Sequence, residues 1–235
     1  MSDQMTADPA GTTASVIRSV APVRRRTALD WAEFSRHWRE EHAAIARGLP
    51  GMVGYTQGHA IPGEQPANRP PTWEYDGVPL ASFPDLAAIG TLRAHPDYHG
   101  RAVPDEALFT DRSSMAAVLL AHCFGEAPAP VSEGRTLMVF ARTGNADERA
   151  GRALAGALGA APGADLALGH RWSTALDADP GLSPRGAAGR PYDGLLEVWF
   201  PSAAPATRAA QAVAADPALL PFEVFCLVVR ENRVV

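Results

Sequence analysis

The chain has 235 residues, a formal net charge of -5 at pH 7, and 21 basic residues, all of them arginine. An acidic chain with no basic stripe is a poor match for a phosphate backbone, so we expect no nucleic-acid partner. The absence of lysine excludes Schiff-base catalysis by a lysine. The first 14 residues lack the basic start and apolar run of a signal peptide, and no apolar stretch is long enough to span a bilayer. These features predict a cytoplasmic protein with no membrane partner.

After a leader at residues 1–14, which we expect to be disordered, residues 16–23 predict a strand. Thr27 and Asp30 then form an expected capping box that opens a helix reaching about residue 47. Further strands are predicted at 49–61 and 73–83, separated by a loop at 62–71 that is rich in proline and glycine. A second helix is expected at 85–94, because His95-Pro96 interrupts it, followed by a compact segment and a final strand at 115–124.

The second half of the chain repeats this order, which indicates an internal duplication. Tyr-Asp-Gly at 75–77 recurs at 192–194, and each copy precedes an apolar strand that ends in Phe-Pro. We also match Gly58-His59 to Gly169-His170. The predicted division is a first repeat at 15–125, a linker at 126–134 and a second repeat at 135–235, with helices near 146–158 and 205–215.

Each repeat therefore has the order βαββαβ, which is typical of a ferredoxin-like α+β unit. Such a unit forms a four-stranded antiparallel sheet with both helices on one face. The two bare sheet faces would cover each other and form a barrel, in which we expect an apolar cavity. The loops at 62–71 and 174–190 are placed to act as lids.

Several motifs in the first half resemble the EthD family. They are Phe34-x3-Trp38-x3-His42-Ala43, Leu49-Pro50-Gly51, Tyr55-x-Gln57-x-His59, Pro96-x-Tyr98 and Asp105-Glu106-x-x-Phe109. The resemblance implies a dimeric α+β barrel made of two fused EthD-like units. Related barrels include cofactor-free monooxygenases, polyketide cyclases, dehydratases, and chlorite- and haem-handling enzymes, so the resemblance leaves the reaction open. The second half carries no Phe, Trp or His on the matching helix, which favours a single site in the first repeat.

The candidate catalytic residues are His42 and His59. Helical periodicity places His42 on the face of Phe34 and Trp38, where a histidine can transfer protons near neutral pH. Strand alternation places Tyr55, Gln57 and His59 on one face of the sheet, where they could bind or protonate a carbonyl or phenolic oxygen. Structural roles for both histidines remain open alternatives. The expected substrate-binding residues are Phe34, Trp38, Tyr55, Gln57, Trp73, His170 and Trp199.

Other polar residues are assigned structural roles. Glu41 is expected to reach out to an arginine such as Arg39 or Arg47. His95, Asp97 and His99 resemble a metal-ligand set, but Pro96 disfavours a regular helix there and no third-ligand motif accompanies them, so no metal is expected. Asp105, Asp76 and Asp193 are interpreted as turn or strand-entry residues.

The leading hypothesis is an enzyme without a cofactor, because no nucleotide-binding or phosphate-binding loop motif is present. It would act on an apolar aromatic or polyketide-like small molecule by acid-base catalysis, as a cyclase, dehydratase or isomerase does. Cofactor-free oxygenation and a non-catalytic binding barrel are the alternatives. A haem-binding variant is less favoured, because histidines on sheet or helix faces are weak evidence for an axial ligand. The expected assembly is a monomeric pseudo-dimer or a homodimer.

Overall fold

The structure is a computed structural model of the chain. It describes residues 16–67, 69–115, 117–144, 147–176, 192–215 and 222–235. The expected leader and most of the expected loop at 174–190 lie outside these residues. Within them, no helix is both long enough and apolar enough to cross a membrane.

The main sheet of the described chain is a closed barrel with the strand order β1-β4-β3-β10-β7-β9-β8-β6. Its strands are β1 (Ile17–Val20), β3 (Gly54–His59), β4 (Gly77–Phe83), β6 (Val118–Gly125), β7 (Arg135–Arg142), β8 (Gly169–Ala175), β9 (Gly194–Phe200) and β10 (Glu223–Arg233). Two short strands, β2 (Arg24–Arg25) and β5 (Thr110–Asp111), pair separately at the side of the first repeat.

Each repeat supplies one antiparallel half of this barrel. The order is β6-β1-β4-β3 in the first half and β10-β7-β9-β8 in the second, so strands in the same position of each repeat have the same neighbours. The halves join where β3 pairs with β10 and where β6 pairs with β8. The predicted α+β pseudo-dimeric barrel is thereby confirmed, and closure leaves no free edge among these strands.

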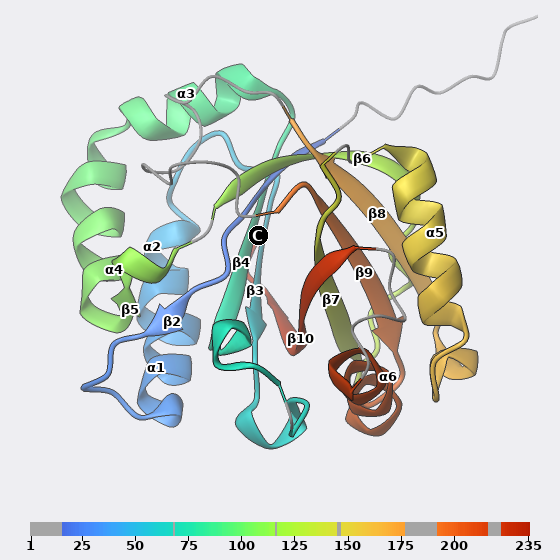
Figure 1. Cartoon of the computed structure of the whole chain (residues 1–235). Helices are drawn as coiled ribbons and strands as arrows, with labels where there is room; N and C mark the ends of the chain where they lie inside the picture. The colour runs from blue at the N-terminus through green and yellow to red at the C-terminus, as the bar shows by residue number, and fades with distance from the viewer. Residues whose placement is uncertain (1–15, 68, 116, 145–146, 177–191, 216–221) are drawn as a thin grey trace, which may run out of the picture.

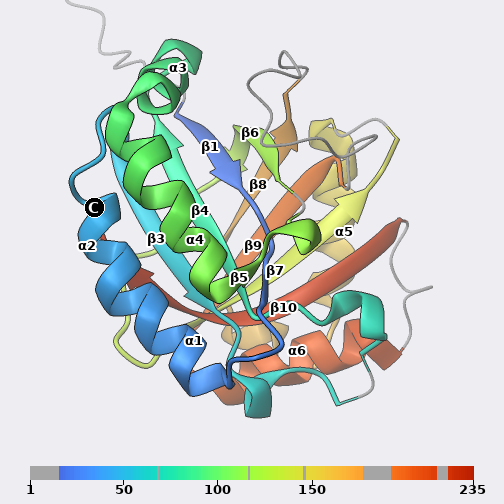
Figure 2. The ribbon, with the colours of Figure 1, turned by 90° about the vertical axis from the view of Figure 1, so that its left-hand side faces the viewer.

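Helices cover the outside of the barrel on two sides (Figure 1). On the side of the first repeat lie α1 (Trp31–His37), α2 (Ala43–Ala46), α3 (Leu86–Ala94) and α4 (Val103–Phe109), with α1, α2 and α4 in front of β1, β3 and β4 in Figure 2. The second repeat is covered by α5 (Glu148–Gly159) and α6 (Ala203–Ala215). The segment after α3, expected only to be compact, is helical, because η4 (Tyr98–Ala102) continues directly into α4.

The first helix begins three residues later than the sequence predicted. Asp30, not Thr27, is the N-cap, and its carboxylate accepts a hydrogen bond from the backbone N–H of Glu33. The Glu33 carboxylate accepts one in return from the backbone N–H of Asp30, which completes the capping box. Asp147 caps α5 in the same way at the matching place in the second repeat. The shared caps show that the two helices start at equivalent positions.

The strand register corrects one match between the repeats. His59 pairs with Gly77 and Thr174 pairs with Gly194, so Thr174, not His170, is the counterpart of His59. His170 occupies the position of Tyr55 and is exposed. The Gly-His sequence match is four residues out of register, because dipeptide similarity does not determine strand pairing.

The barrel interior has two parts, and the apolar cavity that we expected there is reduced to a partly polar hollow of about 140 Å³. One part is a cluster of buried apolar side chains from both repeats, among them Val20, Leu80, Leu120, Met138, Phe140 and Leu227. The other part holds a buried ionic group in which Glu197 binds Arg18 and Arg171. Side chains of an eight-stranded barrel are sufficient to occupy its centre. A pocket with a mostly apolar lining lies elsewhere, between the sheet and the helices.

A tryptophan in each repeat packs on the first glycine of the third strand. A Cβ atom at Gly77 would lie 2.3 Å from Cζ3 of Trp38, and one at Gly194 would lie 2.1 Å from Cη2 of Trp172. Trp38 comes from a helix, whereas Trp172 comes from β8, at the position that Gln57 occupies in β3. Each repeat thus packs an indole on this glycine, but the tryptophan comes from a helix in the first repeat and from a strand in the second.

We expect Gly77→Ala to lower the free energy of unfolding by about 1–3 kcal/mol, because the added methyl group overlaps the Trp38 indole. Gly90→Ala is the matched control. A Cβ atom there would meet no described heavy atom within 4 Å, so this helical variant should gain about 0.5–1 kcal/mol. Urea denaturation measures both. Equal stability of the two variants would contradict the contact between Trp38 and Gly77.

Candidate functional site

A pocket of about 150 Å³ lies between the outer face of the first repeat's sheet and its helices. We call this the helix-side pocket. Its floor is formed by β1, β3 and β4, and its walls come from α2, α3, η4 and α4. The apolar wall includes Leu49, Met52, Phe83, Ile89, Leu92 and Met115. A mostly apolar surface with a few polar groups is the usual composition of a small-molecule site. The polar groups that line this pocket are Ser19, His42, Tyr55, Arg93, Tyr98, Glu106 and Arg112.

A wide helical turn positions His42. Between α1 and α2, η1 (Trp38–His42) forms a π-helical turn, in which the carbonyl of Trp38 accepts the N–H of Ala43. Gln57 reinforces the turn, because its Nε2 donates to the same carbonyl at 2.7 Å. π-helical turns occur frequently at functional sites because they change the direction of one side chain. Phe34, Trp38 and His42 are all buried, as the helical pattern predicted.

His42 is held by Asp105. His42 Nδ1 lies 2.8 Å from Asp105 Oδ2, and both side chains are largely buried. A carboxylate can only accept, so Nδ1 carries the proton of this contact, and proton transfer to a substrate would use Nε2. This pairing fixes the tautomer and the orientation of a ring that lines the helix-side pocket. The arrangement is that of a general base with an orienting carboxylate.

Asp105 is ionised in this arrangement. Partial burial by itself would raise the pKa of Asp105, but hydrogen bonds from His42 and His37 outweigh it and lower the pKa below its ordinary value. His37 Nε2 lies 3.0 Å from Asp105 Oδ1. Both oxygens of the carboxylate are therefore engaged, and its negative charge is placed to stabilise an imidazolium at His42. The prediction that Asp105 caps a turn is wrong, since it lies within α4 and faces η1.

Tyr55 is the second polar group on the pocket floor. Its hydroxyl accepts a hydrogen bond from Trp38 Nε1 at 3.0 Å, which leaves the hydroxyl proton for another partner. Burial raises the pKa of Tyr55 well above its ordinary value, so the phenol stays neutral. The rings of His42 and Tyr55 meet edge to face with centroids 6.4 Å apart. The pocket thus combines a proton acceptor and a proton donor.

His59 lies on the far side of Trp38 from His42. Strand alternation does place it on the face of Tyr55 and Gln57, and that face is covered by helices. The His59 ring packs against Trp38 at a tilt of 45° with centroids 4.6 Å apart, and its Nδ1 lies 3.0 Å from Ser35 Oγ. His59 and Gln57 do not line the helix-side pocket. A substrate in that pocket would be separated from both by the indole.

Burial lowers the pKa of His59 from 6.5 to about 4, with further lowering by the charges of Arg39 and Arg230. The unfolded chain therefore binds a proton at higher pH than the folded chain does. We expect this group to lower the free energy of unfolding by up to about 3 kcal/mol as pH falls from 6.5 to 4. Denaturation at several pH values should give a shallower slope for His59→Asn, whereas His99→Asn, at an exposed histidine, should keep the slope of the wild type.

The other expected substrate contacts are dispersed. Phe34 and Trp38 belong to a hydrophobic cluster with Val23 and Phe109 behind the pocket. Trp73 is buried in the core between the second repeat's sheet and its helices. Trp199 faces the barrel interior, and His170 is exposed beside Phe124. Of the expected binding residues, only Tyr55 lines the helix-side pocket.

The remaining polar candidates hold the structure. Glu41 is half exposed and contacts Arg36 and His37, not the arginines we named. The loop at 62–71 is no lid for the helix-side pocket, because it packs on the second repeat, where Gln65 bonds both backbone groups of Val228. Among the described residues, no group of three His, Cys, Asp or Glu side chains has the geometry of a metal site.

Sequence reasoning missed the Asp105 partner and the helical segment that carries it. The motif Asp105-Glu106-x-x-Phe109 was visible, but an isolated aspartate near a proline resembles a turn residue. A helical pattern in residues 98–109, with Ala102 and Phe109 buried, was the available signal. This helical pattern would have placed Asp105 on a helix that faces the helix of His42.

Comparisons with known proteins agree with this architecture. Residues 26–113 match the EthD domain model, whereas no curated protein matches the chain. An anthrone oxidase-like protein aligns over 95% of this chain and 94% of its own, at 14% identity and a TM-score of 0.59. A Fusobacterium nucleatum subsp. nucleatum protein, provisionally named a monooxygenase, aligns over 94% of both chains, at 8% identity and a TM-score of 0.54. At these identities the likeness establishes the fold.

The closed barrel with a pocket under the first repeat's helices defines a pseudo-dimeric α+β barrel protein whose two halves are fused in one chain. The part that contains His42, Tyr55 and Asp105 lies within residues 26–113, which match the EthD domain model. The second repeat has the same strand order without the residues of that site.

Proposed function

We propose that this chain is a cofactor-independent enzyme that removes a proton from an apolar aromatic or polyketide-like small molecule. His42 is the general base and Asp105 orients it. The single observation that carries the proposal is the 2.8 Å contact between His42 Nδ1 and Asp105 Oδ2 at the wall of an apolar pocket. A base held in one tautomer and facing a water-poor surface is the arrangement that proton abstraction requires.

The proposed chemistry follows from His42 and Tyr55. His42 Nε2 would take a proton from an acidic C–H or O–H of the substrate, and Asp105 would stabilise the imidazolium that results. Negative charge then develops on the substrate oxygen conjugated with that position. Tyr55, a neutral phenol, would donate a hydrogen bond to this oxygen. The enolate or phenolate can then cyclise, lose water or be reprotonated elsewhere, as in a cyclase, a dehydratase or an isomerase.

The size of the pocket favours a small substrate. A volume of about 150 Å³ is that of a cavity that accommodates one benzene ring. A larger polyketide-like molecule would place its reacting ring in the helix-side pocket and extend outward from it. The apolar wall would bind the ring by burial of its surface.

A second candidate is cofactor-free oxygenation by the same residues. The names of two structural neighbours, an anthrone oxidase-like protein and a provisional monooxygenase, favour it. The first step would again be proton removal by His42. The electron-rich anion would then reduce dioxygen itself, so that the substrate supplies the electrons and oxygen is the oxidant. A need for oxygen separates this outcome from cyclisation or dehydration.

We would compare the wild type with His42→Ala and the matched control His99→Ala on a panel of aromatic and polyketide-like compounds. Products are followed by mass spectrometry with and without air. We expect turnover to fall by roughly 10²–10⁴-fold in His42→Ala and to persist in His99→Ala. Oxygen-dependent products would identify the second candidate. Binding without turnover by the wild type, unchanged in His42→Ala, would contradict catalysis and leave a binding barrel.

A further inference from the structure

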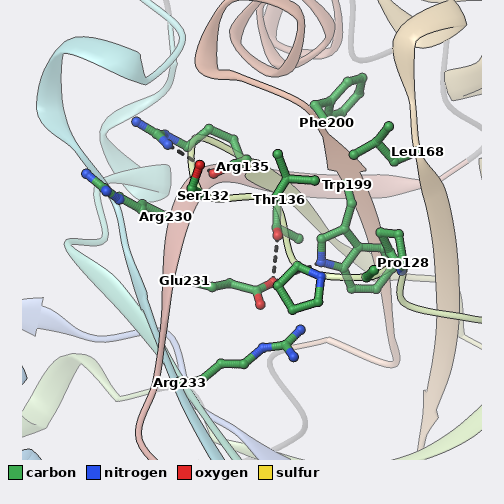
Figure 3. A pocket seen from close by; sticks show the side chains of 14 residues that line it. Pro128, Ser132, Arg135, Thr136, Leu168, Trp199, Phe200, Arg230, Glu231 and Arg233 are labelled. Carbon is green, nitrogen blue, oxygen red and sulfur yellow. Dashed lines mark hydrogen bonds between the residues drawn. The ribbon is translucent and has the colours of Figure 1, made fainter.

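A second hollow of about 220 Å³ lies at the junction of the two repeats (Figure 3) and shares no lining residue with the helix-side pocket. We call it the linker pocket. Its outer wall is the segment between β6 and β7, including Pro128, Val131 and Ser132. Its inner wall is formed by β7, β9 and β10, with Thr136, Trp199 and Arg233. A smaller hollow in the barrel interior shares Trp199, Glu231 and Arg233 with it, so the linker pocket continues into the barrel.

The apolar wall of the linker pocket is exposed. Val131 and Leu168 keep 46% and 45% of their surface accessible, and both line the pocket. Leu166, 46% exposed, lies two residues from Leu168. Phe200 and the Trp199 ring complete this side. Large apolar side chains gathered at a hollow indicate a surface that an apolar ligand can cover.

Cations outnumber carboxylates at the inner wall of the linker pocket. Glu197 is shared by Arg18 and Arg171, and Arg171 also lies over the Trp199 ring at 5.2 Å. Glu231 is held by Thr136 at 2.6 Å and by Trp199 Nε1 at 3.0 Å, as Figure 3 shows. Three arginines and two glutamates line the hollow in the barrel interior, so one positive charge is in excess there. Arg230 adds a further cation to the lining of the linker pocket.

Arg233 supplies that excess charge. It is exposed, and no carboxylate of the described residues forms an ion pair with it. Alternation along β10 directs Arg233 and Glu231 to the interior, whereas Arg230 and Asn232 lie on the side of the first helix, and Arg230 also lines the linker pocket. Arg135, also in the wall, is already neutralised by Glu64. A guanidinium beside an apolar wall fits a ligand that has one carboxylate on an apolar body.

We infer that the linker pocket is a second ligand site, which binds a small aromatic carboxylate. The carboxylate lies against Arg233, and the ring lies between Trp199 and the side chains of Val131 and Leu168. The site is built mainly by the second repeat, which lacks the His42 machinery. It is independent of the proposed function, because it shares no residue with the helix-side pocket.

The test titrates the full chain with 2-naphthoate and with the uncharged 2-naphthamide by calorimetry. The Trp199 indole N–H is followed by NMR and assigned with Trp199→Phe. We expect 2-naphthoate to shift the indole signal and to bind at least tenfold more tightly than the amide. Arg233→Gln should weaken 2-naphthoate about tenfold, as loss of one charge-assisted contact does. Arg149→Gln, at an exposed arginine of α5, is the charge-matched control and should leave the affinity unchanged.

A second pair of variants tests the apolar wall. Val131→Asp should abolish binding, whereas Val53→Asp, at another exposed valine outside the pocket, should not. His42→Ala should leave 2-naphthoate binding unchanged, so this site and the catalytic proposal can fail separately. Equal affinity for acid and amide, or an unchanged affinity in Arg233→Gln, would overturn the inference. A Trp199 signal that does not move, or binding lost in His42→Ala, would place the ligand in the helix-side pocket and overturn it as well.

Discussion

Asp105→Asn is expected to lower kcat by roughly 10²–10⁴-fold on any substrate that the wild type converts. Asparagine keeps the size of the side chain but removes the negative charge that stabilises the His42 imidazolium. Its amide can also donate to His42 Nδ1, which favours the tautomer whose Nε2 carries the proton and cannot accept one. KM should change little, because Asp105 is not among the residues that line the helix-side pocket. Steady-state kinetics at matched enzyme concentration measures both constants.

Asp97→Asn is the matched control for this prediction. Asp97 is exposed and forms only a long contact, 3.7 Å, with Arg101. Its kcat should equal that of the wild type. Thermal unfolding of each variant separates a lost charge from a lost fold, since Asp105 also joins α4 to η1. A stable Asp105→Asn variant with unchanged kcat would contradict the role of the His42 and Asp105 pair.

Glu197→Gln is expected to lower the free energy of unfolding by about 3–5 kcal/mol. The carboxylate is 1% exposed and receives Arg18 Nη1 at 2.7 Å and Arg171 Nε at 2.8 Å. Burial by itself would raise the pKa of Glu197, but these two arginines lower it, so the buried group is charged. Removing its charge leaves Arg18 buried without compensation, which is the costly way to break a buried ion pair. Urea denaturation at pH 7 measures the change.

Two comparisons make this prediction specific. Glu223→Gln breaks an exposed pair with Arg142 at 3.6 Å and should change stability by less than about 1 kcal/mol. The double variant Arg18→Met/Glu197→Leu should recover much of the loss, because it removes both buried charges and uses the leucine that the first repeat has at this position, Leu80. A small effect of Glu197→Gln alone would show that the arginines reach solvent.

The agreement between sequence and fold depends on the duplication. The repeated Tyr-Asp-Gly and Phe-Pro signals mark the third strand of each repeat, and apolar alternation marks the other strands. The order of the elements along the chain could therefore be predicted. The aspartates of the two copies act alike. Asp76 accepts the backbone N–H of Arg25, and Asp193 accepts those of Thr143 and Gly144. Both bind the chain that follows the first strand of their repeat, as strand-entry residues should.

The candidate site was less predictable for a physical reason. Period-two alternation shows that Tyr55, Gln57 and His59 share a face, but it does not show whether that face is covered by helices or by the other sheet. Helical periodicity also does not reveal the π-helical turn that orients the His42 side chain. The Trp38 ring separates Tyr55, which lines the helix-side pocket, from His59, which does not. Only the packing of Trp38 on Gly77 in the folded chain shows this separation.

The sequence by itself determined the duplication, the βαββαβ order, the EthD resemblance, and the placement of His42 on the buried face of the first helix. These follow from local spacing and from residue types, which persist whatever the chain packs against. Only the tertiary structure decided that much of the barrel centre is packed, that a mostly apolar pocket lies under the helices, and that Asp105 holds His42 from 63 positions away. Contacts between distant segments depend on how the elements pack, and no periodicity along a single chain contains that information.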